Sequence, residues 1–365
     1  MAGKWRGKMD KVLLAAVILI AILGIMFIYS ATWDTDTTPG GLNPRVVKQS
    51  VWVGAGLVIM FIIANIDYRR IIDYAYIVYG LNLILLLFIL IFAGERFGAR
   101  RWIDFGPVSL QPSEFIKINV ILVLAAFLGE RREKIGTLSN YCLALLLISP
   151  AFLLIFLQPD LGTALVLVPI LFSMVYISGE RVRYILSSIF LGLAGLPVLW
   201  SVLKDYQKNR LLVFLNPDID PLGAGYTIIQ SKIAIGSGGF WGKGWLNGTQ
   251  SYLKFLPERH TDFIFSVIGE EWGYAGAVCL IALYALIIAR GIKIISEIDD
   301  IYGKTITAGI ITLIAFQVFV NISMTIGLMP VVGLPLPAIS YGGSNTVASL
   351  IGAGFLLSIS RGVRR

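Results

Sequence analysis

The sequence predicts an all-α polytopic integral membrane protein with about ten transmembrane helices. Of its 365 residues, 57% are hydrophobic and only 14% are charged, whereas soluble domains average about 25% charged residues. The mean hydropathy is +0.81, and the apolar residues form long uninterrupted runs, which the short elements of a water-soluble core do not contain. An ordinary soluble enzyme is therefore excluded.

A helix needs about 20 apolar residues to cross the hydrocarbon core of a bilayer. Ten segments meet this requirement: 12–31, 50–66, 74–93, 112–129, 141–158, 160–179, 184–203, 264–289, 303–328 and 338–360. The first run is too long for a signal peptide and lacks a small-residue cleavage site, so we expect it to be retained. The fourth begins at Pro112, a residue suited to a first helical turn.

The basic residues predict the orientation of these spans. Lys4, Arg6, Lys8 and Lys11 precede the first span, and with ten crossings most basic residues of the other short loops fall on the same side. Because cytoplasmic loops carry the excess of Lys and Arg, both termini are expected in the cytoplasm. The net charge of +8 is then explained by the basic residues that orient the spans, and it does not require a nucleic-acid partner.

The spans are expected to form one transmembrane domain over residues 1–365, with one long connection. Residues 204–262 form a large extracytoplasmic loop between the seventh and eighth spans, and it is rich in Gly and Trp. Connections of this length are often functional, so chemistry is expected at this face. Within the loop, residues 226–239 are expected to form a short helix along the membrane surface.

The segment 256–265 brings several polar residues to the start of the eighth span, and Asp262 is the most informative of them. One interpretation is structural: Asp262 or Thr261 caps the helix and satisfies its free N–H groups. The other is functional: Asp262 is a base in a water-accessible cleft, with a pKa raised by desolvation. The residues alone leave both open.

A second polar segment, 111–117, places Glu114 and Lys117 three residues apart on one helix face, where an ion pair is expected. Unpaired charges in a span cost about 2.5–3.5 kcal/mol each. The pair is either a bridge between helices or part of a functional cavity.

A third segment, 158–163, is expected to form a tight outward turn in which Asp160 caps the sixth span or faces the same cavity as Glu114. On the same side, Arg100 and Arg101 stand next to Trp102. These arginines either bind a phosphorylated headgroup or anchor the protein at the interface.

Two nucleotide-binding motifs fail in the glycine-rich segment 236–244. A Walker A motif would need glycine where Ser237 stands, and a GxGxxG motif would need glycine in place of Trp241. We therefore interpret the segment as a surface loop that approaches a substrate or partner closely.

Segment 327–345 interrupts the helical pattern at membrane depth with many Gly and Pro residues. Non-helical backbone is tolerated there only when it is buried in protein or lines a cavity, and we expect this segment to line a cavity. Glu270 and Glu271 in the eighth span serve either function or interhelical hydrogen bonding. Cys142 and Cys279 lie in apolar runs and His260 is the only histidine, so a zinc site is excluded and any metal would have oxygen ligands.

Five segments together resemble the SEDS family of bacterial cell-wall proteins: 111–114, 158–162, 234–239, 256–265 and 334–343. The resemblance extends over nearly the whole chain. Three shorter segments, 216–217, 220–226 and 248–250, are more similar to the RodA-type branch that serves cell elongation than to the division branch.

The resemblance implies a ten-helix peptidoglycan glycosyltransferase of the bacterial cytoplasmic membrane. Such an enzyme polymerises lipid II into nascent glycan at the outer face, together with a class B penicillin-binding protein and other membrane proteins of the elongation complex. It also implies that Asp262 is the essential acid. The substrate cavity is expected to contain Glu114, Lys117, Asp160, Arg100, Arg101, Arg210, His260 and Ser340.

In this reaction a sugar hydroxyl attacks an anomeric carbon whose leaving group is a polyprenyl diphosphate. A positioned base typically contributes 10²–10⁴-fold, and Asp262 is the expected base. Lys117, Arg100, Arg101 and Arg210, with or without Mg²⁺, are the expected counter-charges for the diphosphate.

Two other classes remain open for such a sequence. Ten spans with Pro- and Gly-broken segments also fit a lipid II flippase or another transporter, although the ionisable residues lie at the outward ends rather than at the midplane. A scaffold that only recruits the transpeptidase would not need Asp262.

Overall fold

The computed structural model describes residues 7–33, 43–92, 101–105, 108–216, 219–220, 223–253 and 255–363. Within these residues the chain is almost entirely helical, with one small antiparallel hairpin, β1 (Ile103–Phe105) and β2 (Val108–Leu110). The helices of the first half are α1 (Lys11–Ala31), α2 (Pro44–Asn65), α3 (Tyr68–Ile72), α4 (Ala75–Phe92), α5 (Pro112–Glu130), α6 (Leu138–Leu157) and α7 (Leu161–Ser178), with a 3-10 turn at Arg132–Lys134.

The second half begins with α8 (Val182–Ala194), α9 (Leu196–Val202), α10 (Asp205–Leu215), α11 (Ala224–Ser237) and α12 (Thr249–Tyr252), and ends with α13 (Ile264–Glu297), α14 (Ile301–Thr325) and α15 (Gly343–Ser360). Among the described residues, nine helices are long and apolar enough to cross a membrane, and the bent pair α8–α9 makes a tenth span if it is counted as one. The predicted polytopic membrane protein is confirmed.

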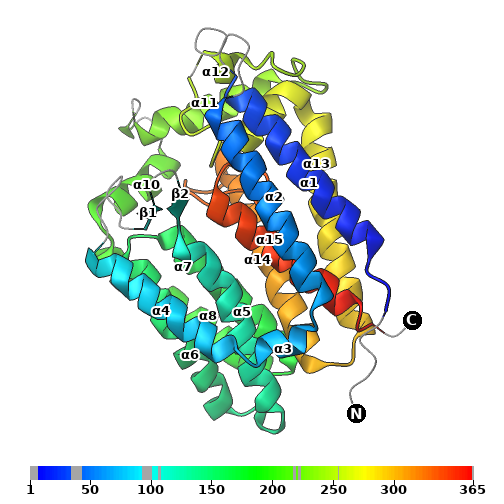
Figure 1. Ribbon diagram of the computed structural model, residues 1–365. Coiled ribbons are helices and arrows are strands. Elements are labelled where there is room, and N and C mark those ends of the chain that lie inside the picture. The colour runs from blue at the N-terminus through cyan, green and yellow to red at the C-terminus, as the bar shows by residue number, and fades with distance from the viewer. Residues whose placement is uncertain are drawn as a thin grey trace.

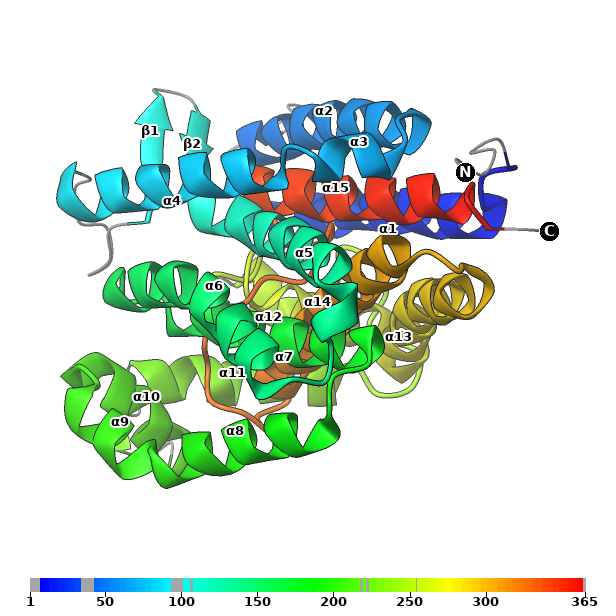
Figure 2. The same cartoon turned by 90° about the horizontal axis from the view of Figure 1, so that it is seen from below.

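Helix α5 is the centre of the bundle. It is buried along nearly its whole length and packs against α4, α6, α7, α14 and α15. Beyond Asn119 the helix is apolar on all sides almost to its end, as expected of a helix in an interior. Around it, α1, α2, α13 and α15 form one side of the molecule, whereas α8 and α9 lie at the opposite edge (Figure 2).

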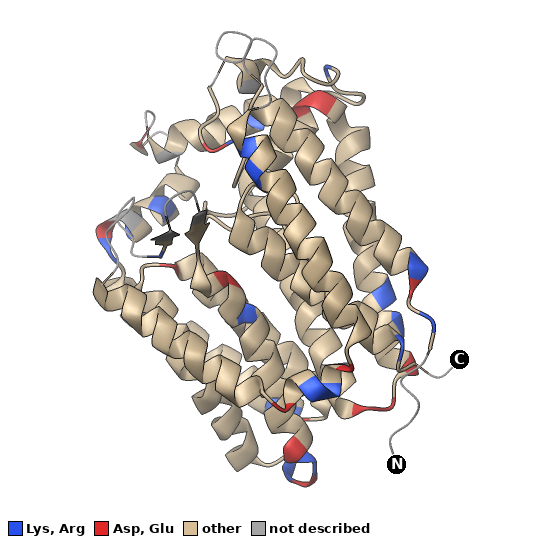
Figure 3. Ribbon diagram, viewed as in Figure 1, with Lys and Arg blue, Asp and Glu red and all other residues tan. Residues whose placement is uncertain are grey.

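Both ends of the chain lie at one end of the bundle, and α10, α11, α12 and the β hairpin lie at the other (Figure 1). The Gly7 N–H donates to the Arg361 carbonyl at 3.0 Å, which ties the two ends together. Lys and Arg, Asp and Glu gather mostly near the two ends of the bundle (Figure 3). The large 204–262 connection is therefore at the end opposite the termini, as expected when seven spans precede it and three follow it, with α8–α9 counted as one span.

Helix α13 corrects the predicted span 264–289. Gly273 breaks it with a φ of 63° and a ψ of −160°, so a short helix over 264–272 precedes a longer one that runs to Glu297. Glu270 and Glu271 therefore stand at the end of the short helix rather than inside a continuous span. Both are buried, and Glu270 pairs with Lys243 at 2.8 Å.

The glycine-rich loop 238–244 satisfies the backbone groups that this break leaves free. The N–H groups of Lys243 and Gly244 donate to the carbonyls of residues 270 and 271, and the N–H groups of residues 274 and 275 donate to the carbonyls of Gly239 and Phe240, all at 2.9–3.0 Å. A Cβ on Gly242 would clash with a carbonyl oxygen of α13. This close approach to α13 gives Gly242 a structural role, and the expected contact of the loop with a substrate or partner stays a prediction.

The last span is shorter than predicted, because residues 338–342 are not helical and α15 begins at Gly343. Residues 327–342 instead form a non-helical loop within the bundle, with Leu334, Leu336 and Ile339 buried. The Tyr284 hydroxyl of α13 donates to the Pro337 carbonyl at 2.6 Å. The predicted interruption of the helical pattern is thus confirmed.

Candidate active site

Asp262 lies in the turn that immediately precedes α13, and it does not cap that helix. The N-cap residue is Phe263, and no side chain donates or accepts a capping hydrogen bond there. The Thr261 hydroxyl bonds instead to the main-chain and side-chain oxygens of Glu258, each at 3.1 Å. The structural alternative considered for Asp262 and Thr261 is therefore wrong.

The Asp262 carboxylate forms no hydrogen bond or ion pair with the part of the chain that the structure describes. The Asn321 side chain bonds to the main-chain oxygen of Asp262 and not to its carboxylate. Burial raises the pKa of this carboxyl to about 6, with a further rise from Glu258 and an opposing effect of Arg210. A carboxylate with no internal partner and a pKa near neutrality is free to accept a proton from another molecule.

Three successive carbonyls hold the Asp262 segment in place. The His260 carbonyl accepts the Tyr341 N–H at 2.8 Å, the Thr261 carbonyl accepts the Ser340 hydroxyl at 2.7 Å, and the Asp262 carbonyl accepts the Asn321 side-chain N–H at 2.9 Å. The donors come from α14 and from the non-helical loop 327–342. This loop is therefore the support of the acid.

Arg101 and Arg210 line one pocket beside this segment, together with Pro159, Gln207 and Val331 among others. The Arg210 guanidinium reaches the Val331 carbonyl at 3.3 Å, and Arg101 bonds to the carbonyls of Gln158 and Pro159. Both arginines are close enough for their positive charges to lower the pKa of the Asp262 carboxyl. The pocket is thus a positively charged cleft next to a carboxylate.

Asp160 has two roles at once. One carboxylate oxygen accepts the Thr163 N–H at 3.2 Å and caps α7, as one of the two interpretations predicted. The same oxygen lies 3.6 Å from an Arg101 nitrogen, so Asp160 also orients this arginine. Asp160 is buried, and its negative charge raises the pKa of Asp262.

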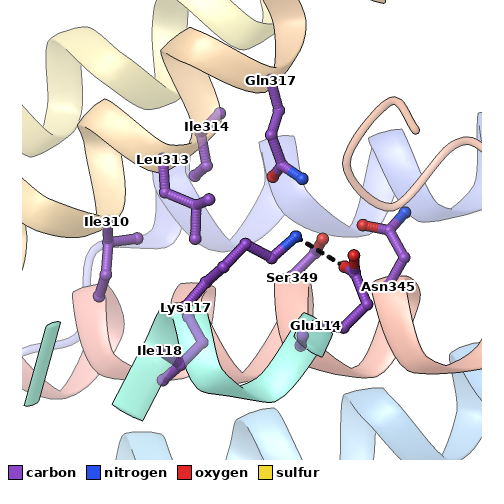
Figure 4. Close-up of a pocket in the computed structure, with 11 residues that line it drawn as sticks. Glu114, Lys117, Ile118, Ile310, Leu313, Ile314, Gln317, Asn345 and Ser349 are labelled. Atoms are coloured by element: carbon purple, nitrogen blue, oxygen red, sulfur yellow. Dashed lines mark hydrogen bonds and ion pairs between the residues drawn. The ribbon is translucent and has the colours of Figure 1, made fainter. Parts of the chain in front are cut away.

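Glu114 and Lys117 form the predicted ion pair, at 2.8 Å and almost fully buried. They line a different pocket, within the bundle between α5, α14 and α15. Gln317 and Asn345 point toward the pair (Figure 4), and the Gln317 amide nitrogen has no partner within the described chain. Asp262 lines neither this pocket nor the arginine-lined one, so its expected place in one cavity with Glu114 and Lys117 stays a prediction.

The other predicted site residues have separate positions. His260 stands with its ring 5.5 Å from that of Tyr341, and burial, assisted by Arg45, lowers its pKa to about 4, so it is neutral at pH 7. Ser340 is buried, and its hydroxyl both donates to Thr261 and accepts the Leu336 N–H at 2.8 Å. Ser340 thus supports the loop instead of facing a cavity, and Arg100 lies outside the described residues.

Two residues near Asp262 were given no role from the sequence, Asn321 and Glu258. Asn321 is a polar residue inside the apolar run 303–328, which is the signal that would have found it. Glu258 is exposed and is the second cause of the raised pKa of Asp262. Nowhere along the described chain do three His, Cys, Asp or Glu side chains gather as a metal site would require.

The chain matches the family model of the FtsW, RodA and SpoVE proteins, described as "Cell cycle protein", over residues 10–365. The peptidoglycan glycosyltransferase MrdB of Escherichia coli K12 is 44% identical over 353 residues, which cover 96% of this chain and 94% of MrdB.

Two solved structures share the fold. One, from work on the "structural coordination of polymerization and crosslinking by a peptidoglycan synthase complex", has a TM-score of 0.79 and 36% identity and covers 97% of this chain and 98% of its own. The other, the rod shape determining protein RodA of Thermus thermophilus, has a TM-score of 0.73 and 33% identity, with 98% of each chain covered. These similarities extend over nearly the whole chain.

Proposed function

The chain belongs to the FtsW/RodA/SpoVE family, and from this membership we propose that it is a peptidoglycan glycosyltransferase that polymerises lipid II with Asp262 as the general base. The observation that carries the role of Asp262 is the state of its carboxylate. It has a pKa of about 6, no partner within the described chain and a cleft with two arginines beside it.

The proton transfer follows from the chemistry of the two sugars. The 4-hydroxyl oxygen of the acceptor GlcNAc forms a bond to the anomeric carbon of the donor, and the bond from that carbon to the diphosphate oxygen breaks. Asp262 takes the hydroxyl proton, and undecaprenyl diphosphate leaves with the electron pair. Hydroxyls are weak nucleophiles, so a base in this position typically contributes 10²–10⁴-fold.

The leaving diphosphate needs positive charge, and Arg101 and Arg210 supply it in this proposal. Both line the pocket beside Asp262, and a guanidinium binds phosphate oxygens through two parallel hydrogen bonds. Asp160 holds the Arg101 guanidinium in place. Lys117 is occupied by Glu114 in a separate pocket, so we do not assign it to the diphosphate.

A divalent cation fits this site only in part. Mg²⁺ is commonly bound by one or two carboxylates together with substrate phosphates, and Asp262 is a carboxylate without an internal partner in the described chain. Mg²⁺ held there would add charge stabilisation for the diphosphate of lipid II, but it would also lower the basicity of Asp262, so the proposal assigns the diphosphate charge to the arginines.

The site lies at the end of the bundle opposite the chain termini, because α10 and α11 of the 204–262 connection stand there (Figure 1). We assign this end to the outer face of the bacterial cytoplasmic membrane and both termini to the cytoplasm, in agreement with the basic N-terminus. A substrate anchored by a polyprenyl chain would then meet the base where its headgroup leaves the bilayer.

We further propose that the chain acts in cell elongation and works with a class B penicillin-binding protein and other membrane proteins of the elongation complex. The support is the structural similarity to a peptidoglycan synthase complex that coordinates polymerisation and crosslinking, together with the similarity to MrdB and RodA.

The decisive experiment is polymerisation of purified lipid II by the purified protein, alone and with its class B partner. Wild type is compared with Asp262→Asn, which keeps the shape of the side chain and removes the base, and with Glu258→Gln as a matched control in the same turn. We expect glycan from wild type and from Glu258→Gln at pH 8, and none above background from Asp262→Asn.

Two outcomes would contradict the proposal. Folded wild type with its partner and no glycan would exclude the polymerase and favour the lipid II flippase. Normal polymerisation by Asp262→Asn would exclude this residue as the base while leaving the enzyme activity standing.

A further inference from the structure

Asn321 is a fully buried asparagine of the apolar helix α14, four residues before its C-terminal end. Its side-chain amide donates two hydrogen bonds, to the Asp262 carbonyl at 2.9 Å and to the Leu334 carbonyl at 2.7 Å. It lines neither of the two pockets described above. A buried polar group in a span is costly and is usually retained for a function.

The two bonds use both hydrogens of one NH₂ group, and this fixes the orientation of the amide. The reverse orientation would place the Asn321 Oδ1 against two carbonyl oxygens, which only accept hydrogen bonds. In the observed orientation Oδ1 is buried and has no partner in the described chain. The Asn321 amide therefore holds two separate stretches of main chain, while its Oδ1 acceptor stays without a partner in the described chain.

These two stretches meet at the carboxylate of Asp262. One is the main chain of Asp262 itself. The other is the loop at 333–334, where Gly333 has a φ of 72° and a Cβ on that residue would lie 3.3 Å from the Asp262 Oδ2 atom. The same amide thus fixes both the backbone that carries the acid and the loop that packs against one of its oxygens.

We propose that Asn321 is a positioning residue for the glycosyl transfer, which acts by holding the Asp262 carboxylate at a fixed place between the loop 327–342 and the arginine-lined pocket. The proposal rests on the proposed function, because it assigns Asn321 to the same reaction. Ser340 and Tyr341 hold the two preceding carbonyls, so loss of Asn321 frees the end of the segment next to the acid without releasing the whole turn.

A displacement of about 1 Å at a catalytic group costs on the order of 100-fold in rate. Removal of Asn321 should lower kcat by up to about 100-fold, because the base is misplaced. The KM for lipid II should stay unchanged, since Asn321 contacts neither pocket. A carboxylate released toward solvent should also ionise at lower pH, which moves the acidic limb of the pH–rate profile downward.

The experiment measures kcat, KM and the pH profile of lipid II polymerisation for Asn321→Ala, Asn321→Leu and Asn82→Ala, with the melting temperature of each. Asn321→Leu keeps roughly the size of the side chain and loses both donors without adding a charge beside Asp262, so it serves if the alanine variant fails to fold. Asn82 is the matched control, because it is a buried asparagine of α4 whose Oδ1 also has no partner in the described chain.

A fall in kcat at constant KM with a displaced acidic limb, in the Asn321 variants and not in Asn82→Ala, supports the positioning role. A folded Asn321 variant with wild-type kcat and an unmoved limb overturns it, and so does a rise in KM at constant kcat. Polymerisation by Asp262→Asn, measured in parallel, would instead refute the base itself.

Discussion

The protonation of Asp262 should set the acidic limit of polymerisation, and two nearby charges should move that limit in opposite directions. With a pKa of about 6, roughly one-tenth of the carboxyl is ionised at pH 5 and roughly nine-tenths at pH 7. A reaction that needs the ionised base should therefore lose about tenfold in kcat/KM between pH 7 and pH 5.

Glu258 and Arg210 act on this pKa with opposite signs. The negative charge of Glu258 raises the pKa of Asp262 and the positive charge of Arg210 lowers it. Glu258→Gln should therefore shift the acidic limb to lower pH, and Arg210→Gln should shift it to higher pH. Glu258 is exposed, so solvent screening should keep its shift below about one pH unit.

The assay is the initial rate of lipid II polymerisation at low substrate concentration from pH 4.5 to 8, for wild type and the two variants. Arg210→Gln should also lower the maximal rate of the pH profile, because Arg210 is assigned to the diphosphate. The pH at which the acidic limb falls to half of that maximum does not depend on the maximal rate itself. An absent limb in wild type, or shifts of the two variants in the same direction, would refute the assignment of Asp262.

Three further predictions concern stability. Since the folded-state pKa of Asp262 lies above its ordinary value of 3.8, ionisation destabilises the fold, and Asp262→Asn should raise the melting temperature above pH 6 but not below about pH 4; an equal difference at both pH values would argue against a buried charge. Glu114→Gln leaves the buried Lys117 ammonium without its partner, so unfolding free energy should fall by about 3–5 kcal/mol; an unchanged denaturation midpoint would contradict this. Gly242→Ala should lower the melting temperature because of the clash with α13 and the φ of 82°, whereas Gly236→Ala, which meets no atom within 4 Å, should not; comparable losses in both would refute the role of the loop.

The sequence predicts the membrane spans well because each one depends on a local property. A run of apolar residues of bilayer length forms a helix wherever it stands, since its backbone can satisfy its own hydrogen bonds in lipid. Pro112 at the start of α5 and the Glu114–Lys117 pair at 2.8 Å follow from helical spacing in the same way. The predictions that failed concern breaks, such as Gly273 in α13.

The candidate site was predictable in its residue types and less so in its arrangement. Polar residues at the ends of apolar runs drew attention to Asp262, Asp160 and Arg101, and the structure places them close together. Sequence spacing could not separate the buried Glu114–Lys117 pocket from the arginine-lined pocket, because the two lie between helices that are distant in the chain.

The sequence by itself therefore determined the membrane architecture and the helical pairing of charges, and it singled out Asp262 as the candidate acid. Only the tertiary structure decided that Asp262 does not cap its helix, that the loop 238–244 repairs the break at Gly273, and that Asn321 holds the acid in place. The physical reason is that each of these depends on hydrogen bonds between segments far apart in sequence, such as the bond between Asn321 and the Asp262 carbonyl, which no local pattern encodes.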